Sequence, residues 1–136
     1  MVKKGFTLLE LLIVISIIGI LVAVATASYS SSQKKARNSR RMSDMKSVQN
    51  AAEQYYADND SVYPPSSVFG VTYLPAGWPS DPKPSYTYTY TPSAVVPVTS
   101  YTACAQMEGA VGNATSPAGV GYPTTGGAYY CVKNLQ

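Results

Sequence analysis

The residues of this 136-residue chain that could carry out chemistry are few and unevenly placed. There is no histidine, so the commonest general base and transition-metal ligand is missing. The two cysteines, Cys104 and Cys131, favour a disulfide, because two thiols alone do not make a zinc site. The remaining candidate is Glu10, which stands inside an apolar run. The composition therefore argues against an enzyme, and we predict no cofactor and no metal site.

The apolar run extends from Phe6 to Ala27, and Glu10 is its one charged residue. As an α-helix with a rise of about 1.5 Å per residue, this run spans the hydrocarbon core of roughly 30 Å. An acidic side chain there costs up to about 2.5–3.5 kcal/mol at the bilayer centre and less near an end. An ionisable group that stays in a membrane segment despite this free-energy cost indicates a function. Its charge needs a partner.

Three interpretations of the run compete. A secretory signal peptide cleaved before Ser28 would have a shorter and uninterrupted apolar core. A plain signal anchor explains the length but leaves Glu10 unexplained. The third starts from residues 3–12, KKGFTLLELL, which closely resemble the processing motif of type IV pilins and of the related type II secretion pseudopilins. We adopt the third interpretation, because it gives Glu10 a partner.

The resemblance implies that a prepilin peptidase cuts between Gly5 and Phe6 at the cytoplasmic face and N-methylates Phe6. It also implies a homo-oligomeric helical filament in which the Phe6 amine of one subunit meets the Glu10 carboxylate of its neighbour. Such a buried pair mainly enforces register, since desolvation offsets much of its Coulomb energy. The implied location is the bacterial inner membrane for the precursor, with the head outside the cytoplasm, and the cell surface for the filament. An assembly ATPase and a membrane platform protein are the other implied partners.

The function expected from this resemblance is that of a structural filament subunit for surface adhesion, motility or DNA uptake. A pseudopilin of a type II secretion system is the alternative within the same class. Two further alternatives belong to other classes of protein. One is a membrane-anchored binding module that does not polymerise, and the other is a small enzyme secreted after cleavage before Ser28. Two features depart from the expected pattern. No proline occurs near Ala27, and the basic residues after the span would by themselves place the C-terminal side in the cytoplasm.

Those basic residues, between Lys34 and Lys46, also raise the question of nucleic-acid binding, since clustered cations attract phosphate. On a helix, Lys34, Arg37 and Arg41 could share a face. Lipid headgroups or a solvated helix surface explain the cluster equally well, and no aromatic platform lies nearby in sequence. We rank nucleic-acid binding below these structural explanations.

The fold class predicted is α+β and pilin-like, with one long helix packed on a small antiparallel sheet. Apolar residues recur at helical spacing after residue 29, at Met42, Met45, Val48, Ala52 and Tyr55. We expect a leader peptide at 1–5, a transmembrane and filament-core helix at 6–28, and an amphipathic second half at 29–60. A small β-rich globular head follows at 61–136.

Three strands are expected in the head, at Tyr86–Thr91, Val98–Met107 and Ala128–Lys133, with a loop from 63 to 79 before them. The pilin resemblance implies that the C-terminal region is closed either by a disulfide or by calcium. The region from Gly109 onwards contains no Asp or Glu, so we expect a Cys104–Cys131 disulfide there.

Overall fold

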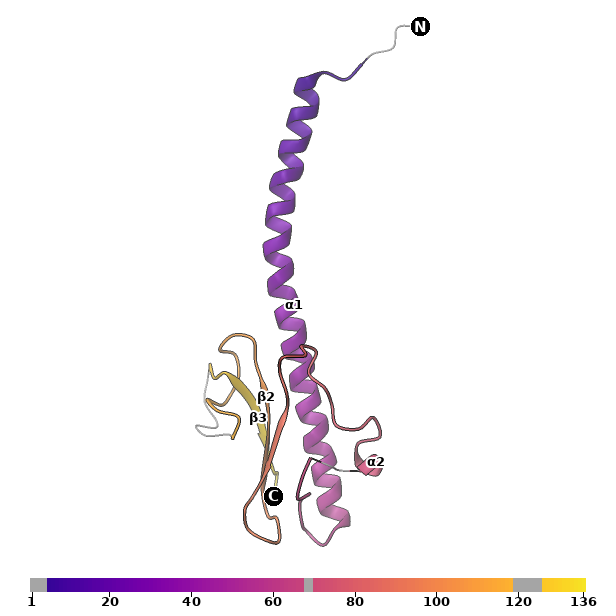
Figure 1. The fold of residues 1–136 in the computed structure, drawn as a ribbon, viewed down its shortest axis with the longest axis vertical. Coiled ribbons are helices and arrows are strands. Elements are labelled where there is room, and N and C mark those ends of the chain that lie inside the picture. The colour runs from indigo at the N-terminus through magenta and orange to yellow at the C-terminus, as the bar shows by residue number, and fades with distance from the viewer. Residues whose placement is uncertain (1–4, 68–69, 119–125) are drawn as a thin grey trace. The chain divides into compact units, whose positions relative to one another are not determined.

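The computed structural model of the chain describes residues 5–67, 70–118 and 126–136 (Figure 1). Its elements, in order, are α1 (Leu8–Asp58), α2 (Gly70–Tyr73), β1 (Thr89–Pro92), β2 (Tyr101–Gln106) and β3 (Tyr129–Lys133). The chain divides into two compact units, Met1–Lys35 and Ala36–Gln136, and α1 contributes to both. The expected combination of one long helix and a small antiparallel sheet is confirmed.

Helix α1 is 51 residues long and covers most of the two predicted helical ranges, 6–28 and 29–60; no proline before Pro64 interrupts it. It ends where Asp60 and Ser61 adopt left-handed backbone angles, with φ of 49° and 61°. The N–H of Ser61 donates to the carbonyl of Tyr56 across 3.2 Å, which satisfies one of the last carbonyls of the helix.

The second half of α1 buries the predicted apolar stripe in the head. Met45, Val48 and Ala52 are fully buried, and Met42 and Tyr55 are half-buried. Figure 1 shows the sheet lying alongside this part of the helix. The stripe therefore serves packing, as expected from its spacing.

The sheet has the order β1-β2-β3 and is antiparallel throughout. In β2, Tyr101, Ala103 and Ala105 face the core shared with α1, whereas Cys104 lies on the other face with Cys131. This alternation is that of a regular strand, in which successive side chains point to opposite sides.

Three details of the head differ from the sequence prediction. Strand β2 runs from Tyr101 to Gln106, shorter than the predicted Val98–Met107. Strand β1 begins at Thr89 instead of Tyr86, where its pairing with β2 begins, and the ring of Tyr86 contacts Lys83 and Arg41. Within the predicted loop from 63 to 79, the short helix α2 forms, and its four residues carry no periodic signal that could have predicted it.

Neighbouring aromatic rings connect the helix, the sheet and the loop in the core of the head. Their centroids lie 4.5 to 6.2 Å apart along a row formed by Tyr56, Tyr63, Tyr101, Tyr90 and Trp78. Aromatic pairs at these separations add about 0.5–1.5 kcal/mol each beyond the area they bury. The row gives a head with few Leu and Ile residues a continuous core.

The predicted disulfide joins Cys104 of β2 to Cys131 of β3, which are direct partners in the strand register. The side chain of Asn113 pairs with the backbone of Cys131, accepting from its N–H at 2.6 Å and donating to its carbonyl at 3.0 Å. Next to it, Gly112 lies against the backbone of Tyr129 and Gly127 against the backbone of Ala114, so closely that a Cβ on either glycine would collide with those atoms. The disulfide and this contact together hold the outer edge of β3.

Replacing both cysteines by alanine should destabilise the head by about 3–4 kcal/mol, the loop-closure value for a sequence separation of 27 residues. The free energy of unfolding can be measured for the full chain in detergent by the fluorescence of Trp78 during denaturant titration. Reducing the unchanged protein under denaturing conditions should give the same loss. Equal stability of the oxidised protein and the double variant would contradict a stabilising role for the bond.

Candidate functional site: the N-terminal segment and the arginine network

The start of α1 is organised by Thr7 and Glu10. Thr7 lies one residue before the helix, and its backbone N–H and hydroxyl both donate to Oε2 of Glu10, each across 2.9 Å. In return, the N–H of Glu10 donates to the Thr7 hydroxyl across 3.2 Å. This reciprocal arrangement is a capping box, which satisfies backbone groups that the first helical turn leaves open. Glu10 therefore already has one partner within its own chain.

Thr7 was not among the predicted site residues. The signature, Thr-x-x-Glu immediately before an apolar run, was readable in the sequence as a helix start. Oε1 of Glu10 accepts no hydrogen bond from any described residue, so the second oxygen of the carboxylate stays open to a further donor. The other predicted site residues here are Gly5, with no atom close to it, and Phe6, with 90% of its surface exposed. Residues 1–4 of the predicted leader lie outside the described residues.

The first part of α1 presents apolar side chains on all sides. Its large hydrophobic residues between Leu8 and Val24 are 48% to 87% exposed. Ser16 and Thr26 donate their hydroxyls to carbonyls one turn earlier in the same helix, so they place no unsatisfied polar group on this surface. By length and composition, α1 is the one helix in the described part of the chain that could cross a membrane.

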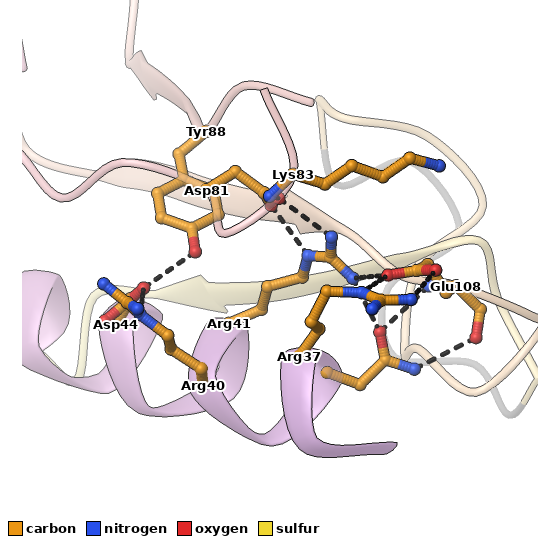
Figure 2. Close-up of polar contacts among 9 residues, drawn as sticks. Arg37, Arg40, Arg41, Asp44, Asp81, Lys83, Tyr88 and Glu108 are labelled. Carbon is orange, nitrogen blue, oxygen red and sulfur yellow. Dashed lines mark hydrogen bonds and ion pairs between the residues drawn. The ribbon is translucent and has the colours of Figure 1, made fainter. Parts of the chain in front are cut away.

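A second polar cluster lies within the head unit, where three residues of α1 meet two distant carboxylates (Figure 2). The guanidinium of Arg41 is fully buried and binds both oxygens of Asp81, at 2.7 and 2.8 Å. The same guanidinium donates to Glu108 at 3.0 Å, and Arg37 binds Glu108 through two bonds of 2.6 and 2.7 Å. Asn38 completes the arginine network by accepting from the backbone N–H of Glu108.

The carboxylates of the network have lowered pKa values. Hydrogen bonds from Arg37 outweigh desolvation and lower the pKa of Glu108 to about 2 from its ordinary 4.5. For Asp81, burial acts to raise the pKa, but the bonds from Arg41 and from the N–H of Lys83 outweigh it, so the pKa is lowered. The pKa of Arg41 is raised by its bonds to Asp81. All three groups are therefore charged at neutral pH.

This geometry argues against the lower-ranked alternative in which Arg37 and Arg41 would bind the phosphates of a nucleic acid. Arg41 is buried, and both guanidinium groups are already bound to carboxylates in bidentate pairs. The pairs join residues 40 and 71 positions apart, so no local pattern predicts them. One signal was available, because Asp81 and Glu108 are the only acidic residues after Asp60.

Replacing Arg41 by methionine should lower the free energy of unfolding by about 3–5 kcal/mol, because Asp81 would stay buried without its counter-charge. The measurement is denaturant unfolding of the full chain in detergent. As a matched control, Arg40→Met removes an exposed arginine with a loose ion pair of 4.0 Å and should change stability by less than about 0.5 kcal/mol. A second substitution, Asp81→Asn, should restore part of the loss; no restoration would contradict the pairing as its cause.

Acid should weaken the head as the network loses its carboxylate charges. The pKa of Glu108 is lower in the folded state, so its contribution to stability is present above about pH 5 and is lost as the pH falls towards 2. Unfolding measured at a series of pH values should therefore show falling stability between about pH 5 and pH 2. Glu108→Gln should be less stable at neutral pH and show a shallower slope in this window; an unchanged slope would exclude Glu108 as a source.

Comparison with known proteins gives matches to the N-terminal part of the chain. The family model for the prokaryotic N-terminal methylation motif matches residues 1–26. The chain is 37% identical over 57 residues to the type II secretion system core protein G of Escherichia coli. It is 39% identical over 69 residues to the type IV major pilin protein PilE1 of Neisseria gonorrhoeae. It is also 43% identical over 51 residues to a fimbrial protein of Pseudomonas aeruginosa. No solved structure gives a significant match.

These matches cover 42%, 51% and 38% of this chain, and 39%, 32% and 33% of the respective relatives. The chain thus spans well under half the length of the curated relatives that it matches. The shared region contains the Gly5–Phe6 boundary, the capping box and the apolar part of α1. Over this segment, the chain is similar to type IV pilins, fimbrial proteins and a type II secretion core protein.

Proposed function

We propose that the chain is a structural subunit of a type IV pilus-like filament, cut between Gly5 and Phe6 and polymerised through its N-terminal helix. The observation that carries this proposal is the contrast along α1. The large apolar side chains from Leu8 to Val24 are about half or more exposed, whereas Met45 and Val48 in the same helix are completely buried.

Such an apolar surface is unfavourable in water, at roughly 25 cal/mol for each Å² left exposed. A membrane covers it in the precursor, and the same segments of neighbouring copies cover it in the filament. The matches to a major pilin and a fimbrial protein support this use of the segment. The proposal therefore places the precursor in the bacterial inner membrane, with its head outside the cytoplasm.

The open oxygen of Glu10 gives the assembly step a specific chemistry. Cleavage before Phe6 creates a cationic amine at the head of the helix, and that amine can donate to Oε1 of Glu10 on a neighbour. Thr7 would keep hold of Oε2 and so fix the orientation of the carboxylate. Because both charges lose water inside an apolar bundle, a neighbour out of register would leave them unpaired. The pair therefore sets the axial position of each subunit.

The machinery in this proposal consists of a prepilin peptidase that cuts and methylates, an assembly ATPase and a membrane platform protein. Their need follows from the chemistry of the proposed steps, which are hydrolysis of one peptide bond, methylation of the new amine and extraction of an apolar helix from lipid. Extraction is energetically uphill by about 0.8 kcal/mol for each CH₂ group moved into water, so it requires either an energy source or a continuous apolar path.

A pseudopilin of a type II secretion system is the second candidate, favoured by the match to core protein G of Escherichia coli. Its filament would use the same N-terminal chemistry and stay within the envelope. Electron microscopy of sheared cell-surface material, followed by identification of its main protein, separates the two. A membrane-anchored binding module that does not polymerise would give no filament in either place.

Replacing Glu10 by alanine should leave membrane insertion intact and reduce filament yield at least tenfold, because the register pair is lost. Sheared filaments can be counted by electron microscopy, and membrane-bound precursor measured by immunoblotting. The matched control is Ser16→Ala, which removes a hydroxyl from the same apolar segment where it bonds its own helix. Normal yield from the Glu10 variant would rule out the register role.

Mass spectrometry of the mature N-terminus tests the processing step separately. The proposal expects methylated Phe6, whereas a secreted protein would begin at Ser28 and a plain signal anchor would keep Met1. Either of the last two results would overturn the filament proposal, whatever the yield of the Glu10 variant.

A further inference from the structure

A small hollow in the head lies between α1 and the loop that carries Trp78. Its volume is about 340 Å³, at the small end of the range for ligand sites. From α1 it is lined by Arg40, Asp44 and Ser47, and from the loop by Leu74 and the segment from Ala76 to Ser80. The hollow belongs entirely to the unit Ala36–Gln136.

The polar groups of this hollow differ from those of the arginine network. Arg37 and Arg41 are saturated by carboxylates, but Arg40 is 63% exposed and has only a loose ion pair with Asp44, at 4.0 Å. Arg40 donates no hydrogen bond to any of the described residues. Asp44 accepts one hydrogen bond within the described residues, which the Tyr88 hydroxyl donates to its Oδ2 across 2.7 Å. Figure 2 shows Arg40 and Asp44 side by side, with Tyr88 bound to the carboxylate. The hollow thus contains guanidinium donors and a carboxylate oxygen, Oδ1, that the fold does not use.

Trp78 adds a rigid apolar wall. Its ring meets Tyr90 edge to face at a centroid distance of 6.2 Å, which connects it to the aromatic row of the core. A second hollow, which shares the segment Trp78–Ser80 with the first, has a volume of about 430 Å³. Its carboxylate, Asp81, is already bound to Arg41, and its Tyr86 ring is covered by cations. Of the two, the first hollow therefore has the polar groups that are better able to bind a ligand.

We propose that the Arg40–Asp44–Trp78 hollow binds a neutral hexose ring of a glycan. A sugar ring combines an apolar face of C–H groups, which packs on an indole, with neighbouring hydroxyls that both donate and accept. Arg40 would donate to one hydroxyl and Oδ1 of Asp44 would accept from the next. The two charges balance each other, so the hollow suits an uncharged ring better than an anionic one. This proposal needs only the folded head and does not depend on filament assembly.

The fluorescence of the full chain in detergent gives a direct test, because Trp78 is the single tryptophan of the protein. The probes are the methyl glycosides of glucose, galactose and mannose, each added in a titration. At least one should change the emission of Trp78 saturably, whereas glycerol, which has hydroxyls but no ring face, should not. Absence of a saturable change with all three glycosides would overturn the proposal.

Variants assign the binding to the hollow. Arg40→Ala and Asp44→Asn should each weaken binding about tenfold, as expected for the loss of one charge-assisted hydrogen bond. Lys35→Ala is the charge-matched control, because Lys35 is exposed and does not line the hollow, and its affinity should equal that of the unchanged protein. The emission spectrum without sugar verifies that each variant is folded. Equal weakening in all three variants, or tighter binding of galacturonate than of galactose, would contradict the assignment.

Discussion

The fully buried guanidinium of Arg41 is the interaction on which the arrangement of the head depends. It takes a charge from the helix into the protein interior, where it must be matched by carboxylates that are themselves held in place. Asp81 comes from the loop before the sheet and Glu108 from the residues after β2, so one side chain connects three segments that are distant in the sequence. Because any of these charges would be costly if left alone, the three segments are fixed relative to one another within the head.

The same helix faces two very different environments along its length. Its first part exposes apolar side chains, and its second part buries an apolar stripe against the sheet and its polar groups in the arginine network. In the proposed filament, lipid or a bundle of identical helices would cover the first part, while the head covers the second by itself. This division would allow a subunit to stay folded when the surroundings of its N-terminal segment change from lipid to protein.

The head makes a stable core with little Leu or Ile by using tyrosines, a disulfide and charge pairs together. The aromatic row supplies the apolar area, and the Cys104–Cys131 bond joins the last two strands at the point where they already pair. The glycines beside β3 allow the neighbouring backbone to come close enough for Asn113 to bond along its edge. Arg37 and Arg41 are held by carboxylates of the head, whereas Arg40 and Asp44 form only a loose ion pair.

The features that depend on local pattern could be predicted from the sequence. These are the long helix, its division into an apolar and an amphipathic part, the alternating faces of β2 and the Gly5–Phe6–Glu10 motif. The disulfide could also be predicted, because only two cysteines are present. Such features are readable because helical and strand periodicities place neighbouring residues in space without reference to the rest of the chain.

Which of the clustered charges are buried depends on the tertiary structure. Arg37, Arg40 and Arg41 stand within five positions of one another, and their own segment does not show that two of them pair with distant carboxylates. Whether each of these arginines pairs with a carboxylate depends on where the folded loop and sheet place Asp81 and Glu108. The hollow beside Trp78 depends on the same long-range packing. Contacts across 40 or more residues are set by the summed energy of the whole head, which no short stretch of sequence contains.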